Sequence, residues 1–380
     1  MSTVPQVTAP LIPAAPAEQG VRAVPAAQPR AAERLLSLDA YRGLILFVLV
    51  SNGLGIPALA AYPHWRWLAD QFEHAAWTGI TFWDLVQPGF TFMVGVAMPF
   101  ALARRQAEGA SFGDLFRHVC WRALILIALS NLLSNFGEDH LQFQLINVLS
   151  QIAFGYVICF LILQVPLRWQ IAMGAALLAL QWALFVLFPW AQGPFSQTNN
   201  IGQMIDRAVL GYTYSGDYVT INFLGNAVTI LFGCWTGLLL CARRPHAFTL
   251  RVLAAVAVGA CLTGLALAPF NPVIKRLWTA SFMFLSTGCV MALMTALLLL
   301  IDVRGWKRWT FPFVVLGTNS IFVYSFWQLL GGWLDRGLVT FTNRFAFLGP
   351  AGEIPHRLVV LAVMWGLCYW LYRRRIFLKV

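Results

Sequence analysis

Charged side chains are scarce in this sequence. Only 11% of its 380 residues are Asp, Glu, Lys or Arg, whereas 59% are hydrophobic. A soluble domain carries roughly 25% charged residues, so the composition excludes an ordinary water-soluble enzyme or binding domain. The net charge of +11 does not indicate nucleic-acid binding, because basic residues accumulate on the cytoplasmic side of membrane proteins.

Several chemical motifs are also missing. The seven cysteines lie in or beside apolar runs and form no CxxC pair, so neither disulfides nor a thiolate metal site is expected. The sequence contains no Walker loop, dinucleotide-binding glycine pattern, HExxH helix or nucleophilic serine elbow. These absences argue against nucleotide hydrolysis and metal catalysis, and we expect no metal site.

Long apolar runs fill almost everything after Leu38. A helix needs about 20 apolar residues to cross a bilayer, and the runs provide about ten segments of that length. We therefore expect an all-α fold, a polytopic transmembrane helical bundle of about ten spans. The predicted spans are 39–61, 80–103, 119–136, 145–165, 170–188, 221–241, 251–270, 279–301, 311–332 and 357–373.

The first 34 residues differ from the rest of the chain. They are rich in proline and alanine and contain no aromatic residue, so they cannot bury enough apolar surface to fold alone. We expect 1–34 to be a disordered cytoplasmic tail and 35–380 to be one transmembrane domain. No removable signal peptide is expected, because no short apolar core with a cleavage site follows a basic start.

The positions of Lys and Arg predict the orientation. A cytoplasmic N-terminus puts most of the 26 basic residues at or near the cytoplasm, in agreement with the positive-inside rule. An even number of spans then places both termini inside, N-in and C-in. The loop 62–79 faces outward, and His74 lies on the non-cytoplasmic side.

Within the stretch 72–100, His74 lies at a membrane edge, ten residues before the carboxylate of Asp84. Acidic groups at membrane depth are costly, so Asp84 is a functional candidate by default. If 78–103 is helical, Asp84 sits about 1.5 turns inside the second span. Its side chain either orients His74 or pairs with a basic group from another helix, such as Arg122. A structural histidine and a buried ion pair are the plain alternatives.

An ordered series of motifs strengthens the functional interpretation. R-x-x-S-L-D-x-x-R-G starts at Arg34, an Asn-Gly pair follows at Asn52, and H-x-x-W-x-G-x-T-x-x-D-L-x-x-P starts at His74. The later segments that fit are NVLSQIAFGY from Asn147, KRLWTASF from Lys275 and PFVVLGTNSIFVY from Pro312. From about Arg34 to Phe326 the chain resembles the heparan-alpha-glucosaminide N-acetyltransferase family and its bacterial relatives.

This resemblance implies an integral membrane acyltransferase. Such an enzyme takes acetyl from cytoplasmic acetyl-CoA and transfers it to an amino sugar or envelope glycan at the outer face. The resemblance assigns the central catalytic role to His74, with Asn52 and Asp84 beside it. The family's Leu-Gln-Arg in the fourth span appears here as Leu-Ser-Gln at 149–151, so one cation is absent. A neutral imidazole can serve as the base or can accept the acyl group itself.

Further polar, aromatic and basic residues are candidates for ligand contacts. Asparagine and glutamine within spans ordinarily form interhelical hydrogen bonds, but together they suggest a polar cavity. We assign substrate binding to Trp77, Asn147, Gln151, Asn226, Trp278 and Asn319, and binding of acetyl-CoA to Arg42, Arg104, Arg105 and Lys275. Orientation and anionic-lipid contact explain the cytoplasmic cations equally well, and Arg42 is also spaced for an ion pair with Asp39.

A second function class stays open from the residues alone. A transporter or permease for a sugar-like solute would use His74 and Asp84 as a proton or substrate relay, and a non-catalytic scaffold is a weaker third option. We favour the acyltransferase, in a bacterial-type inner membrane. Its expected partners are the lipid bilayer and a small-molecule or glycan acceptor, with no nucleic acid, and a homo-oligomer is left open.

Overall fold

The computed structural model describes residues 35–188 and 192–378. The expected tail 1–34 lies outside the described residues. Over the described ranges the regular secondary structure is helical and contains no strand. The predicted all-α fold is therefore confirmed.

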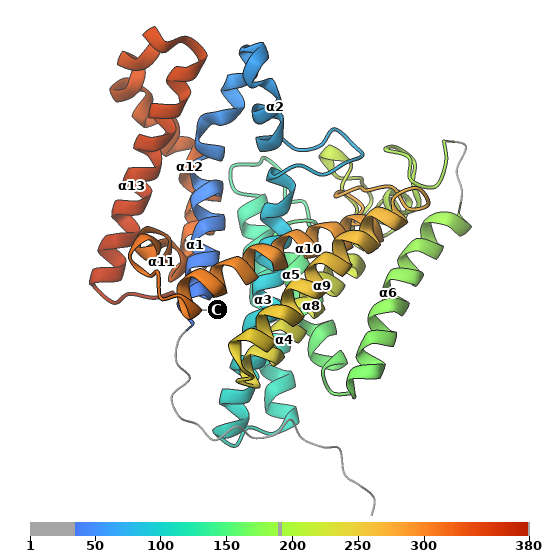
Figure 1. Ribbon diagram of the computed structural model, residues 1–380. Coiled ribbons are helices and arrows are strands. Elements are labelled where there is room, and N and C mark those ends of the chain that lie inside the picture. The colour runs from blue at the N-terminus through green and yellow to red at the C-terminus, as the bar shows by residue number, and fades with distance from the viewer. Residues whose placement is uncertain (1–34, 189–191, 379–380) are drawn as a thin grey trace, which may run out of the picture.

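Thirteen α-helices follow one another in the described part of the chain (Figure 1). Their bounds are α1 (Leu36–Val50), α2 (Arg66–Ala69), α3 (Val86–Ala107), α4 (Phe112–Ser134), α5 (Val148–Ile162), α6 (Leu167–Leu187), α7 (Ile201–Leu210), α8 (Phe223–Cys241), α9 (His246–Leu267), α10 (Ala280–Leu297), α11 (Phe311–Gly317), α12 (Ser320–Thr342) and α13 (Glu353–Arg373). Short 3₁₀ segments cover Gly53–Ala61, Pro63–Trp65, Asp70–Phe72, Trp83–Leu85, Ser215–Asp217, Thr220–Asn222, Arg308–Thr310 and Asn343–Gly352, and Leu298–Val303 forms a π-helical turn.

Eight stretches of the described chain are long and apolar enough to cross a membrane. They are Leu36–Ala61, Trp83–Ala107, Phe112–Ser134, Leu167–Leu187, Ser215–Cys241, His246–Leu267, Ala280–Val303 and Ser320–Arg373. The last stretch contains both α12 and α13, and α5 is a shorter apolar helix of 15 residues. The chain is thus a multi-pass membrane protein, while the count of about ten spans and the N-in orientation stay predictions.

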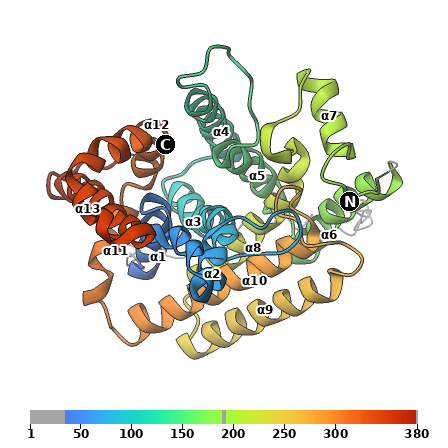
Figure 2. The same ribbon diagram turned by 90° about the horizontal axis from the view of Figure 1, so that it is seen from above.

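Helices α3 and α8 lie in the interior of the bundle. Seen from above, α1, α3 and α8 lie between α11 to α13 on one side and α6 and α7 on the other (Figure 2). Helix α3 packs on α8, α8 packs on α5, and α9 runs along α10. The loop after α2 lies at one end of the bundle, called here the α2 end, and the α3–α4 connection lies at the opposite end (Figure 1).

Two predicted spans are interrupted where the backbone leaves the α conformation. The span 39–61 is α-helical only as far as Val50, because Asn52 and Leu54 take positive φ values of 45° and 59°. The span 311–332 breaks after Gly317, and α12 begins at Ser320 and continues to Thr342. Asn319 marks that break, since its side chain bonds the backbone near the C-terminus instead of a helical neighbour.

Glycines allow α3 and α8 to approach closely. A Cβ atom at Gly95 would lie 2.0 Å from the backbone oxygen of Ile230, and one at Gly233 would lie 2.2 Å from that of Phe92. Small residues permit such backbone contact between membrane helices. Because α3 follows directly on Asp84, this contact also determines where the carboxylate sits.

We predict that Gly95→Ala destabilises the protein by about 1–3 kcal/mol, because the added methyl group forces two backbones apart. Thermal unfolding of the purified protein in detergent measures the loss. Gly259→Ala in α9 is the matched control, since a Cβ there would meet nothing within 4 Å. Equal unfolding temperatures for the two variants would contradict the close approach.

Candidate active site

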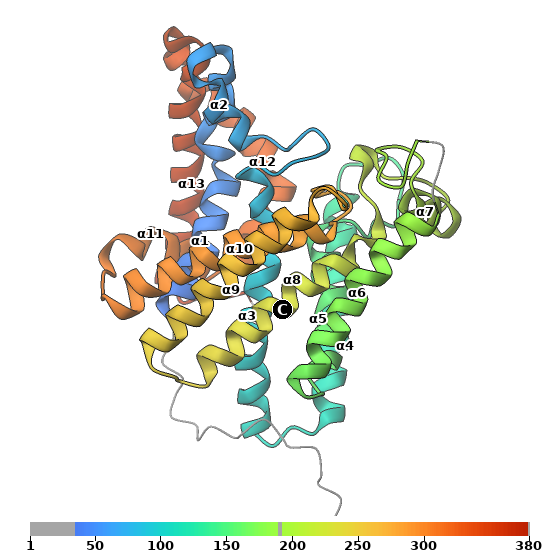
Figure 3. The same cartoon turned by 45° about the vertical axis from the view of Figure 1, so that its right-hand side comes forward.

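Two loops that are far apart in sequence meet at the α2 end of the bundle. His74 lies in the irregular stretch between Asp70–Phe72 and Trp83–Leu85, and Lys275 lies in the connection between α9 and α10. The amide of Gly79 donates to the Val273 carbonyl at 2.8 Å. The Arg276 guanidinium donates to the carbonyl of Ala76. Figure 3 shows the first loop reaching across toward the start of α10.

Asp84 is the centre of the hydrogen-bonding network formed by these loops. Its side chain is 1% exposed. One carboxylate oxygen, Oδ1, contacts His74 Nδ1 at 2.7 Å and Lys275 Nζ at 3.3 Å. The other, Oδ2, accepts from the backbone amides of Ala75 and Thr81 at 3.2 and 3.3 Å and from the Thr81 hydroxyl at 3.1 Å. These donors and the cation stabilise the ionised carboxylate.

The network determines which ring nitrogen of His74 carries the proton. Nδ1 lies 2.7 Å from a carboxylate oxygen that can only accept, so a proton must lie between them and we assign it to Nδ1. Lys275 lies 3.1 Å from the same nitrogen and donates instead to Asp84. Nε2 is then the basic nitrogen. The His74 side chain is 43% exposed, and Asp84 fixes its ring through Nδ1. The same arrangement of carboxylate and ring occurs in catalytic histidines that a carboxylate orients.

Lys275 supplies a buried positive charge. Its side chain is 8% exposed, and burial lowers its pKa to about 8, while the negative charge of Asp84 opposes that shift. At neutral pH the lysine is mainly protonated, and it offsets the charge of the buried carboxylate. Both sequence-based interpretations of Asp84 are seen in the contacts, because the carboxylate contacts His74 and also pairs with a basic group from a distant segment. That group is Lys275 and not Arg122, which donates to the Tyr156 hydroxyl at 3.2 Å.

Asp84 also lies at a different depth from the one predicted. Residues 74–82 are irregular, and α3 begins only at Val86, so the carboxylate sits in the short 3₁₀ segment Trp83–Leu85 at the start of the span. The expected helix from residue 78 is wrong for a physical reason. Asp84 bonds the amides of Ala75 and Thr81, which must point back toward it and cannot join a helical ladder.

Other candidates line or border this site. Trp77 is partly buried, donates to the Phe195 carbonyl at 3.0 Å and has the Arg276 guanidinium 5.7 Å from its ring centre. Asn52 is exposed in the left-handed conformation, and the neighbouring Gly53 packs against Phe72, two residues before His74. We find no side-chain hydrogen bond from Asn52 to His74 or Asp84.

Buried polar atoms without partners gather near the starts of α5 and α8. Gln151 donates to the Leu145 carbonyl at 3.0 Å but leaves Oε1 unpaired, and both polar atoms of Asn226 are unpaired. Asn147 caps α5 and accepts from Tyr324 at 3.1 Å. These residues fit the predicted polar interior.

Asn222 joins this group, although it was not among the assigned site residues. Its Nδ2 donates to the Arg276 carbonyl at 3.3 Å, while its Oδ1 is unpaired. The asparagine therefore links the start of α8 to the loop that carries Lys275. Its sequence signal is that of a polar residue within the predicted span 221–241, which places it with the asparagines and glutamines of the suggested polar cavity.

The remaining assigned residues lie apart from His74 or have structural partners. Trp278 is 1% exposed and donates to Thr229 at 3.1 Å, so it offers no free face to a sugar. Asn319 bonds the backbone of Ile376 and Leu378 at 2.9 and 3.0 Å.

The basic candidates are also spread over the fold. Arg42 lies 3.8 Å from Asp39, and Arg104 lies 3.6 Å from Glu108 near the α3–α4 connection. Arg105 is in the last turn of α3. Lys275 alone among the four joins the site. Within the described residues no group of three or more His, Cys, Asp or Glu side chains is placed to hold a metal ion.

Comparison with known proteins adds an independent observation. No family model matches this chain. Human heparan-alpha-glucosaminide N-acetyltransferase is 26% identical across 91% of the chain, and the mouse protein of the same name is 23% identical across 92%. The chain is related to these acetyltransferases. The resemblance seen in the motifs is thereby confirmed, and the chain spans about 60% of the length of the curated relatives it matches.

We predict that Asp84→Asn slows chemical modification of His74 several-fold. An amide accepts the Nδ1 proton more weakly than a carboxylate does, so Nε2 becomes a poorer nucleophile. Modification by diethylpyrocarbonate at pH 7, followed by peptide mass spectrometry, measures the rate at His74 alone. Asp114→Asn is the control, because that carboxylate is exposed and pairs with Arg117. An unchanged rate in Asp84→Asn would mean that the carboxylate does not increase the nucleophilicity of Nε2 in His74.

Proposed function

We propose that this chain is an integral membrane acyltransferase that moves an acetyl group from acetyl-CoA to an amino sugar or envelope glycan. One observation carries the proposal. His74 is held through Nδ1 by a fully buried carboxylate, while its ring is open to solvent at the end of a membrane bundle. The relation to N-acetyltransferases supports the same chemistry.

In the proposed reaction His74 Nε2 removes a proton from the acceptor amine or hydroxyl. The acceptor atom attacks the thioester carbonyl, the new bond to carbon forms, and the carbon–sulfur bond breaks. Coenzyme A leaves as a thiolate and takes up the proton from the imidazolium. Asp84 stabilises that imidazolium, and Asn52 is the proposed donor to the developing oxyanion.

A two-step relay uses the same groups. Nε2 itself attacks the thioester carbonyl, the carbon–sulfur bond breaks, and coenzyme A leaves as a thiolate while acetyl-imidazolium forms. The acceptor then attacks the acetyl carbon, the bond from that carbon to Nε2 breaks, and the acceptor's proton goes to water. Rapid mixing distinguishes the two routes, because the relay releases one equivalent of coenzyme A per protein before any acceptor is added.

The predicted N-in orientation is the basis for placing the two substrates. With the N-terminus in the cytoplasm, the α2 end faces outward and His74 meets an outer-face acceptor. Acetyl-CoA enters from the opposite end, where Arg42, Arg104 and Arg105 provide cations for its phosphates. The unpaired polar atoms of Gln151 and Asn226 fit a passage that binds the amide groups of its pantetheine arm. We place the protein in a bacterial-type inner membrane.

The first test is release of free thiol from acetyl-CoA by purified protein with a panel of glucosamine-type acceptors. We expect acceptor-dependent release in the wild type and a fall of about 10²-fold or more in His74→Ala, with unchanged thermal unfolding. His64→Ala is the matched control, since that histidine lies in the same loop region away from Asp84. Well-folded protein that neither binds acetyl-CoA nor releases thiol would favour the transporter, and solute flux in vesicles would then be measured.

We further predict that transfer declines as pH rises through about 8. Lys275 loses its proton in that range because burial lowers its pKa to about 8, and Asp84 then has no cation beside it. Below pH 8 the lysine is charged and the site is intact. Lys275→Met, which never carries the charge, should be slow at every pH and lack this decline. Initial rates from pH 6.5 to 9.5, corrected for spontaneous thioester hydrolysis, give the profile, and a wild-type rate that stays level to pH 9.5 would refute it.

A further inference from the structure

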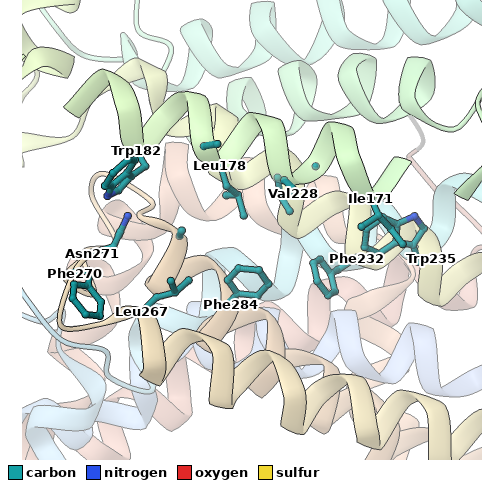
Figure 4. Close-up of a pocket in the computed structure, with 14 residues that line it drawn as sticks. Ile171, Leu178, Trp182, Val228, Phe232, Trp235, Leu267, Phe270, Asn271 and Phe284 are labelled. Carbon is teal, nitrogen blue, oxygen red and sulfur yellow. The ribbon is translucent and has the colours of Figure 1, made fainter. Parts of the chain in front are cut away.

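A long apolar groove lies on the face of the bundle beside the active-site loops. It has a volume of about 570 Å³ and is lined by α6, α8, α10 and the end of α9. Ligand sites commonly have volumes of about 300–1,000 Å³. Figure 4 shows Trp182 and Asn271 at one end, Leu178 and Phe284 between, and Trp235 at the other end.

The groove has the shape and chemistry for a hydrocarbon chain. Its walls are almost entirely apolar, so a sugar cannot bind along it. Along α6 it extends from Ile171 to Trp182, which is about 16 Å at 1.5 Å per residue. It lies among membrane-spanning helices, where lipid chains are the available occupants.

The end of the groove near Trp182 adjoins the loop that carries Lys275. The side chain of Gln181 donates to the Leu277 carbonyl at 2.7 Å, which joins α6 to that loop. Ile80, six residues after His74, packs in the same apolar cluster as Leu178. This end of the groove is therefore adjacent to the loop that carries Lys275.

Two polar features at this end indicate a headgroup. Asn271 lines the groove, is only 4% exposed, and its Oδ1 has no hydrogen-bond partner. Such an oxygen accepts from a hydroxyl or ammonium group of a ligand. The second feature, the Arg276 guanidinium, lies outside the groove on the loop that Gln181 contacts, where it donates to the Ala76 carbonyl and lies over the Trp77 ring. Its positive charge is complementary to an anion.

From these observations we propose that the acceptor is a lipid-linked amino sugar, joined to its hydrocarbon chain through a phosphate. The chain lies in the groove, the phosphate faces Arg276, and a sugar hydroxyl donates to Asn271. The sugar amine then extends from the Trp182 end of the groove to His74. This inference rests on the proposed acyltransferase function and specifies its acceptor.

The activity test compares two synthetic acceptors that differ only in their chain, glucosamine 1-phosphate hexadecyl diester and the corresponding methyl diester. We expect the hexadecyl compound to have a KM about tenfold lower in the wild type. Ala179→Trp fills the groove and should abolish this difference. Ala176→Trp is the matched control, because it is equally exposed on α6 but lies outside the groove. Equal KM values for the two acceptors, or equal effects of the two tryptophans, overturn the proposal.

A second test does not need activity. Hexadecyl phosphate with a diazirine in its chain is photolysed with the protein in detergent, and the labelled residues are mapped by mass spectrometry. We expect labels on residues 171–182 and 228–235 that are lost in Ala179→Trp and retained in Ala176→Trp. The proposal is overturned if all lipid-facing helices are labelled uniformly. It is also overturned if an ordinary phospholipid competes with the probe as well as hexadecyl phosphate does.

The two tests also separate the two ideas. Groove labelling without thiol release from any acceptor means that the acyltransferase proposal fails, and with it the acceptor assignment. Thiol release with methyl and hexadecyl acceptors alike means that the enzyme is correctly assigned and the groove is not its acceptor site.

Discussion

The buried carboxylate of Asp84 is the constraint on which the candidate site depends. A carboxylate with 1% exposure must have its charge offset and its oxygens hydrogen-bonded, or its desolvation would be prohibitive. His74 and Lys275 meet one oxygen, and the loop amides of Ala75 and Thr81 meet the other. The irregular shape of the loop follows from this requirement. The two distant loops converge because each supplies part of what the carboxylate needs.

Some of this arrangement was predictable from the sequence and some was not. The interval between His74 and Asp84 is short, so a local loop can bring them together, and the sequence predicts their pairing as one of two alternatives. Lys275 lies 201 residues from His74, and its role depends on how α9 and α10 pack. Nothing in the local pattern distinguishes that lysine from an ordinary interfacial cation. The sequence alone therefore groups Lys275 with the cations that are expected to bind acetyl-CoA.

The same limit explains the misplaced helix boundaries and several assigned residues. Hydropathy locates apolar length well, and each predicted span overlaps a helix in the structure. Hydropathy does not register a side chain that holds backbone groups outside a helix, as Asp84 does with the amides of Ala75 and Thr81. It also cannot separate an interfacial tryptophan from Trp278, whose indole is buried against Thr229. Those distinctions arise from tertiary contacts.

The shortness of α5 has a consequence for how the bundle fills the bilayer. Its 15 residues span about 22 Å, whereas the hydrocarbon layer is about 30 Å thick. A helix of this length cannot cross that layer alone, so the chain at one of its ends must be sheltered by protein or water, because exposed backbone is not tolerated within the hydrocarbon layer. An aqueous recess next to α5 would make the dielectric barrier locally thinner.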